Sequence, residues 1–160
     1  MKCAELEHCS FDDSVNDFLD IANDADGFIF GSPMHYAAAG GTITSFMDRV
    51  FYTALVGGRQ SFYLKPAATV ISARRAGTTA TFDQLNKYFI ISQMPIISSR
   101  YCNMVHGAKP DLKKDLEGLQ TMRVLARNMA WFLKCKDAGT KAGVQLPLLE
   151  ETVYTNFIRE

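Results

Sequence analysis

The sequence is poor in several features that would define a function class. Its 160 residues include one tryptophan, five prolines and four cysteines, and 17 lysines and arginines balance 17 aspartates and glutamates. Four unevenly spread cysteines are too few for the disulfide framework of a secreted domain. A net charge of zero argues against the strongly basic face that nucleic-acid binding requires. No apolar run approaches the roughly 18 to 20 residues of a membrane span, and no signal-peptide pattern opens the chain.

What remains is the composition of an ordinary globular domain, with 48% hydrophobic and 21% charged residues. The length predicts one domain over residues 1–160. Within it we distinguish a cysteine-containing N-terminal segment, 1–12, and a C-terminal tail, 144–160. The tail is apolar enough that we expect it to dock on the domain or on a second subunit. With neither an apolar run of membrane length nor a signal-peptide pattern, we expect a cytoplasmic protein.

Short apolar runs alternate with longer stretches of helical period, a pattern typical of βαβ units and a parallel sheet. The first run, GFIF at 27–30, has no polar alternation, so we expect a strand covered on both faces. Further strands are expected at 66–72 and 94–98. Helices are expected at 15–22 with Asp12 as the cap, at 43–55, after a cap at Thr78 or Thr79, and along the stripe 112–133.

In an open α/β sheet, ligands bind beyond the carboxyl ends of the strands, which here selects three loops, 32–41, 73–79 and 100–109. The first carries small residues that would let a planar ring approach the backbone. Two arginines in the second suit an anionic or electron-rich edge. The third combines aromatic and polar side chains.

These loops carry a family resemblance. ADGFIFGSPMHY at 25–36, followed by TSFMDR at 44–49, is similar to the flavin-loop signature of the flavodoxin-like NAD(P)H-dependent FMN reductases, which include the iron-sulfur flavoproteins. SARRAGTT at 72–79 and YCNMVHG at 101–107 resemble two further segments of that family. Cys102 departs from the pattern, which commonly has tryptophan there.

The resemblance implies a flavodoxin-like three-layer α/β/α fold that carries FMN and uses NAD(P)H as co-substrate. It places the isoalloxazine along the loop 32–36 and the pyrimidine edge of this ring at the loop 74–78. The third loop, 100–109, would complete the substrate pocket. The implied cofactor-binding residues are Ser32, Pro33, Met34, His35, Tyr36, Ala73, Arg74, Arg75, Gly77 and Thr78, and the implied substrate-binding residues are Tyr101, Asn103 and His106. His35 is the candidate catalytic residue, as a proton donor to the reduced acceptor.

The resemblance also implies elements that the sequence lacks. Family members open with a strand and a Gly, Ser and Arg-rich loop around the FMN phosphate, and nothing similar precedes Met1, so we expect an N-terminally truncated chain. Cys3 and Cys9 resemble the last two of four cluster-binding cysteines in a related subgroup. Two thiolates do not hold a four-iron cluster, so we expect no metal site.

Three functions follow from this reading. The first is an FMN-dependent NAD(P)H oxidoreductase that reduces a small-molecule acceptor such as a quinone, a nitro compound or a flavin. The second is an electron-transfer module of the iron-sulfur flavoprotein type, and the third is a fragment without cofactor. The resemblance implies a homodimer or a higher homo-oligomer.

Overall fold

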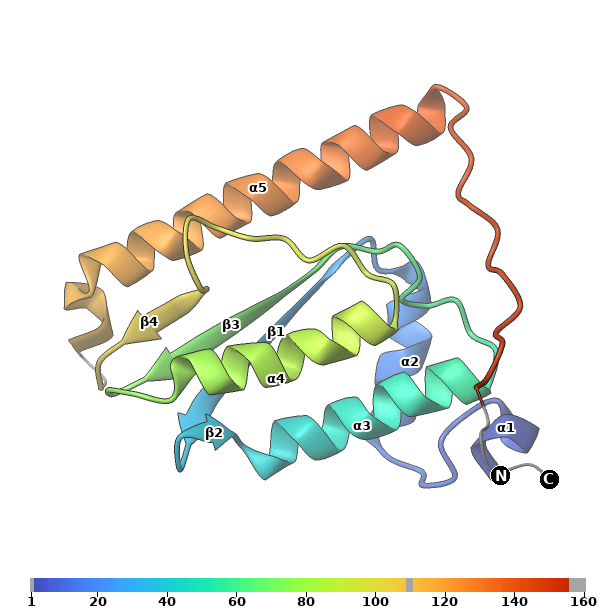
Figure 1. Cartoon of the computed structure of the whole chain (residues 1–160), viewed down its shortest axis with the longest axis horizontal. Helices are drawn as coiled ribbons and strands as arrows, with labels where there is room; N and C mark the ends of the chain where they lie inside the picture. The colour runs from blue at the N-terminus through green and yellow to red at the C-terminus, as the bar shows by residue number, and fades with distance from the viewer. Residues whose placement is uncertain (1, 109–110, 156–160) are drawn as a thin grey trace.

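The computed structural model describes residues 2–108 and 111–155 and forms three layers around a four-stranded sheet (Figure 1). The strands are β1 (Phe28–His35), β2 (Ala38–Ala39), β3 (Ala67–Ala73) and β4 (Met104–His106), in the order β2-β1-β3-β4. β1, β3 and β4 run parallel, whereas β2 pairs antiparallel with the end of β1. The α/β fold with a mostly parallel sheet is therefore confirmed.

The helices divide between the two faces of this sheet (Figure 1). α2 (Ser14–Asp24), α3 (Gly41–Val56) and α4 (Thr78–Ile91) cover one face, and α5 (Leu116–Lys141) covers the other. Two short helical segments, α1 (Lys2–Leu6) and η1 (Asp111–Lys114), complete the described elements. No helix in residues 2–108 or 111–155 combines the length and the apolar character that crossing a membrane requires.

The larger core lies between β1, β3 and the three helices of the first face. It is built from aromatic and aliphatic side chains such as Phe30, Phe51 and Phe89, whose rings pack at centroid distances of 5.5–6.2 Å. A smaller core between β3 and α5 contains Ala68 and Met129. Because two cores occupy opposite faces of β3, this strand is buried along almost its whole length.

β1 does not meet the expectation of a strand covered on both faces. Its residues alternate between buried and exposed, with Phe28 and Phe30 in the larger core and Ile29 57% exposed on the opposite face. The reason is the position of α5, whose buried residues pack with Ala68 of β3. The prediction that the apolar run 27–30 is buried on both faces was therefore wrong for one face of the strand.

Two further expectations are corrected. Residues 94–98 form no strand, since only the isolated bridge between Ala67 and Ile96 is made there; the third parallel strand is β4, inside the segment predicted as a loop. The caps also differ by one residue. Asp13 rather than Asp12 caps α2 through a hydrogen bond from the Val15 amide at 3.1 Å, and Gly77 precedes α4 without a side-chain cap.

Candidate functional site

The strand β1 continues through the predicted ring-binding residues and turns back on itself. Met34 and His35 pair with β2, so the segment 32–39 is a hairpin rather than an open loop. Tyr36 (φ 44°) and Ala37 (φ 63°) form its turn in left-handed backbone, the region that both central residues of a type I′ hairpin turn occupy. The Sδ atom of Met34 accepts a hydrogen bond from the Ala37 amide at 3.0 Å. The Tyr36 side chain is fully exposed at the tip.

A cavity of about 540 Å³ lies between this hairpin and the beginning of α3. Its lining is Gly31, Ser32, Pro33, His35, Gly40, Gly41, Thr42, Ile43 and Phe46. Small residues leave this space open: a Cβ atom added to Gly40 would lie 2.9 Å from Cδ2 of His35, whereas one added to Gly41 would meet nothing within 4 Å. The cavity therefore combines exposed backbone with an imidazole at its edge.

The loop that follows β3 packs directly against the hairpin. A Cβ atom on Gly77 would lie 2.7 Å from the Cα atom of Ala37, so glycine at this position allows the two loops to touch. Ala73 ends β3 and Thr78 begins α4, and both are buried. The structure thus brings the first two predicted loops together.

Arg74 and Arg75 lie in the loop after β3, and both are exposed. Neither lines the cavity, and neither forms an ion pair within the described part of the chain. Two unpaired guanidinium groups at the carboxyl end of a strand are available to an anionic partner.

The third predicted loop contributes to a different cavity. Tyr101 and His106 line a smaller space of about 140 Å³ against the beginning of α5. Asn103 is completely buried, and its side-chain nitrogen and oxygen have no partner among the residues that the structure describes. The backbone nevertheless joins this segment to the others, because His106 pairs with Ala73.

Sequence reasoning missed four lining residues of the main cavity, Gly31 in β1 and three residues in α3. Thr42, Ile43 and Phe46 line it from the first turns of α3, and Ile43 and Phe46 also pack against the larger core, as the helical period predicted. The Gly40-Gly41 pair at the start of the helix could have indicated these residues. A helix that begins at small residues leaves its first amide groups exposed, so its first turn can line a binding cavity.

The cysteines of the N-terminal segment do not fit a metal cluster. Cys9 is buried, and its Sγ atom accepts a hydrogen bond at 3.0 Å from Arg49, which also pairs with Asp13 at 2.8 Å. Burial raises the pKa of the Cys9 thiol, but the hydrogen bond from Arg49, a backbone hydrogen bond at Phe11 and the positive charge of Arg49 together outweigh it, so that the net pKa is lowered. Within residues 2–108 and 111–155, no three His, Cys, Asp or Glu side chains gather as metal ligands do.

The fold is that of the flavodoxin-like α/β proteins. The structure is similar to the flavodoxin WrbA-like protein from Agrobacterium tumefaciens, with 17% identity, a TM-score of 0.53, and coverage of 73% of this chain and 78% of that one. It is also similar to RosB, with 12% identity and a TM-score of 0.56 over 94% of this chain and 69% of the other.

The sequence comparisons place the chain within that class. Residues 1–109 match the family described as NADPH-dependent FMN reductase, and the chain belongs to this family of flavin-dependent oxidoreductases. The iron-sulfur flavoprotein MJ1083 of Methanocaldococcus jannaschii is 28% identical over 138 residues, which cover 82% of this chain and 71% of the relative.

The family implies FMN, and the cavity fits one part of it. Gly40 and Gly41 leave open a space that larger side chains at these positions would fill. Together with the exposed start of α3, this space suits a flat ring that approaches the backbone. The nine lining residues of this cavity include no lysine or arginine, so they offer the phosphate no guanidinium or ammonium group.

Proposed function

We propose that this chain is an FMN-dependent NAD(P)H oxidoreductase that reduces a small acceptor such as a quinone, a nitro compound or a free flavin. The observation that carries the proposal is the glycine-lined cavity at the carboxyl end of β1. This is the edge at which open α/β sheets bind their ligands. FMN, when bound, supplies hydride and electron transfer between the nicotinamide and the acceptor.

The residues of the cavity would bind and orient the ring. Ser32, Pro33 and His35 line one side, whereas Gly40 and Gly41 admit it close to the backbone. Met34 stabilises the turn of the adjacent hairpin through the hydrogen bond that its Sδ atom accepts from Ala37, and Tyr36 forms part of that turn. We assign His35 the role of donating a proton from its imidazole to the reduced acceptor, because its exposed ring stands at the edge of the cavity.

The loop after β3 would supply charge. Arg74 or Arg75 is proposed to donate hydrogen bonds to the electron-rich pyrimidine edge, with Ala73, Gly77 and Thr78 setting the path of the loop. The assignment of Tyr101, Asn103 and His106 to the acceptor stays a prediction. The proposal also includes a homodimer that acts in the cytoplasm.

A visible absorption spectrum tests this function most directly. The chain is mixed with FMN, freed of excess flavin and titrated with NADPH without oxygen. We expect a retained flavin spectrum that bleaches with NADPH and returns when a quinone is added. If the flavin bleaches but only a protein partner reoxidises it, the electron-transfer module replaces the proposed enzyme.

A matched pair of variants shows where the flavin binds. Gly41→Leu places a side chain in the cavity, so we expect FMN affinity to fall at least about tenfold. The fold should tolerate this change, because a Cβ added at Gly41 meets no atom within 4 Å. Gly139→Leu, on the surface of α5 with its Cβ 3.9 Å from Val144, is the control and should bind FMN as the unmodified chain does. Equal affinity in all three proteins would place the flavin elsewhere.

A further inference from the structure

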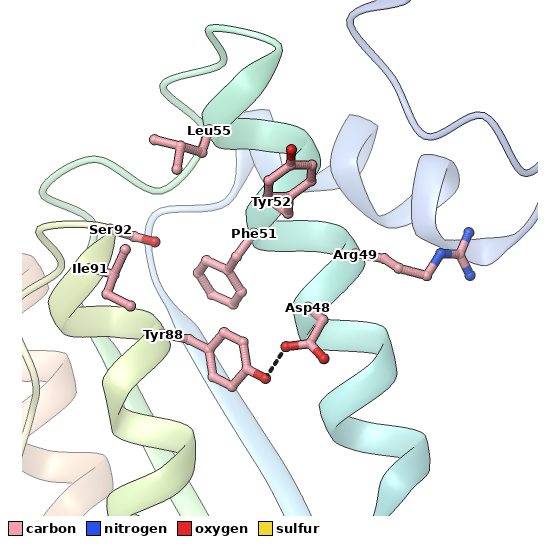
Figure 2. Close-up of a pocket in the computed structure, with 8 residues that line it drawn as sticks. All are labelled: Asp48, Arg49, Phe51, Tyr52, Leu55, Tyr88, Ile91 and Ser92. Atoms are coloured by element: carbon pink, nitrogen blue, oxygen red, sulfur yellow. Dashed lines mark hydrogen bonds between the residues drawn. The ribbon is translucent and has the colours of Figure 1, made fainter. Parts of the chain in front are cut away.

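The two outer faces of the domain differ in how their charged side chains are paired. Between α3 and α4 lies an open groove of about 510 Å³ (Figure 2). Its polar groups find partners within the chain, since Tyr88 donates a hydrogen bond to Asp48. Arg49 points away from the groove (Figure 2) and forms an ion pair with Asp13 at 2.8 Å. The charges on this face are therefore satisfied inside the molecule.

The opposite face of the sheet is covered by α5 alone (Figure 1), and the outer side of this helix carries cations around a tryptophan. Arg123, Arg127, Trp131 and Lys134 follow one another at intervals of four, four and three residues. At 3.6 residues per turn they lie within a sector of about 80°, opposite buried residues such as Leu125. All four are exposed, Trp131 by 67%. We call these four residues the basic face of α5.

The cations of the basic face have no counter-charge in the fold. Among the residues that the structure describes, Arg123, Arg127 and Lys134 form no ion pair. Residues 118–136 of the helix contain no aspartate or glutamate. Arg123 and Arg127 stand four residues apart, a spacing at which like charges destabilise a helix. The stability of the fold therefore explains neither these cations nor the exposed tryptophan beside them.

The acidic groups of the molecule lie elsewhere or are neutralised. Glu117 and Asp137, which flank this stretch of α5, lie 3.9 Å from Arg100 and 2.7 Å from Lys141. The helix α2, on the other face of the sheet, contains three aspartates and no lysine or arginine. A chain of zero net charge thus has an uneven charge distribution, which orients α5 toward an anionic surface.

We propose that the basic face of α5 binds peripherally to the surface of a membrane that contains anionic lipids. Lysine and arginine are attracted to such a surface, and tryptophan favours the boundary between headgroups and acyl chains. The outer side of a single helix is a ridge, about 16 Å long from Arg123 to Lys134 at 1.5 Å per residue, and a ridge meets a flat surface along its length. Nucleic acid fits less well, because the domain as a whole is not basic.

Vesicle binding by the full 160-residue chain tests this proposal without any flavin, so the result is independent of FMN binding. Trp131 is the one tryptophan of the sequence, so its emission reports contact at this face directly. With phosphatidylcholine vesicles that contain about 30% phosphatidylserine, we expect co-sedimentation and an emission shift to shorter wavelength, both reversed by added salt. Vesicles of phosphatidylcholine alone should give neither. A chain that stays in the supernatant with the anionic vesicles overturns the proposal.

A pair of double variants separates the basic face from net charge. Arg123→Gln with Arg127→Gln removes two cations that each contribute about fivefold, so partition onto anionic vesicles should fall at least about 20-fold. Lys2→Gln with Lys87→Gln is the matched control, because it removes the same charge from exposed residues of α1 and α4. Its partition should stay within about threefold of the unmodified value. Equal losses in the two variants overturn the role of α5.

Two further measurements complete the test. Trp131→Gln keeps the charge of the basic face and should weaken partition at least about threefold, whereas unchanged partition overturns the role of the tryptophan. If the double arginine variant fails to fold by circular dichroism, Lys134→Gln serves in its place, with an expected loss of about fivefold. Poly-L-glutamate that shifts the Trp131 emission when anionic vesicles do not would assign the face to an acidic protein and overturn the membrane as its partner.

Discussion

At the scale of single residues, a glycine determines how closely the hairpin and the loop after β3 approach. Gly77 has φ +101°, which other residues rarely adopt, and it contacts the backbone of Ala37 in the hairpin turn. Ala37 and Tyr36 are themselves in left-handed backbone without being glycine, which costs free energy that the surrounding contacts must offset. The contact at Gly77 is therefore part of what holds the hairpin in place.

Replacing this glycine should show the effect of the contact. Gly77→Ala should lower the free energy of unfolding in two ways. An alanine in left-handed backbone costs about 1–2 kcal/mol, and the clash of its Cβ with Ala37 costs about 1–3 kcal/mol. Gly58→Ala is the control, because Gly58 also has positive φ (+70°) but an added Cβ meets nothing within 4 Å. In urea unfolding, Gly77→Ala should lose more stability than Gly58→Ala. Equal losses would mean that the loop contact contributes nothing beyond backbone strain.

At the scale of elements, one carboxylate connects α5 to the sheet. Asp115 precedes α5, and its side chain accepts hydrogen bonds from the amides of Gly118 at 2.8 Å and His106 at 2.6 Å. These two donors lower the pKa of Asp115. Because His106 ends β4, the same side chain fixes both the start of the helix and the shortest strand of the parallel sheet.

The lowered pKa gives this cap a defined pH dependence. The ionised carboxylate stabilises the fold above its ordinary pKa of about 3.9, and this contribution is lost as the pH falls through the lower value of the folded state. Asparagine has one acceptor oxygen where Asp115 uses two, so Asp115→Asn loses one of these hydrogen bonds and should cost about 1 kcal/mol at neutral pH. The difference from the unmodified chain should shrink below about pH 4. Urea unfolding at both pH values measures it.

Asp111→Asn provides the control for this measurement, since it removes the same charge from an exposed residue whose ion-pair partner among the described residues is Lys114. It should change stability by less than about 0.5 kcal/mol at neutral pH. An Asp115→Asn variant as stable as Asp111→Asn would show that the cap does not join helix and strand energetically.

At the scale of the whole molecule, the sheet gathers the predicted site residues at one edge but distributes them between two cavities. The hairpin and α3 form the larger cavity, whereas Tyr101 and His106 lie against α5. The larger cavity offers a ring-binding surface whose lining residues include no lysine or arginine. Affinity for the flavin should therefore come mainly from the ring.

Riboflavin and FMN, which differ by the phosphate, separate these contributions. We expect the two dissociation constants for this chain to agree within about threefold, because charge-assisted bonds to a phosphate are missing from the cavity lining. Fluorescence quenching titrations at two salt concentrations measure both constants. FMN binding that is more than about tenfold tighter, and that weakens with salt, would show that Arg74, Arg75 or another cation holds the phosphate.

The sequence by itself determined the alternation of strands and helices, because apolar runs and helical stripes depend on local periodicity. It therefore predicted β1, β3 and the four helices α2, α3, α4 and α5, and its motifs led to the correct family. β4 escaped prediction because it is three half-buried residues long and exists only through its pairing with Ile71 and its neighbours.

Only the tertiary structure decided which surfaces are covered and which loops meet. The exposure of Ile29 depends on where α5 lies, and the contact between Gly77 and Ala37 joins residues 40 positions apart. The same holds for Leu55, which continues the helical stripe of α3 but faces an open groove instead of the core. Local sequence sets the period of an element, whereas burial is a property of the elements packed around it.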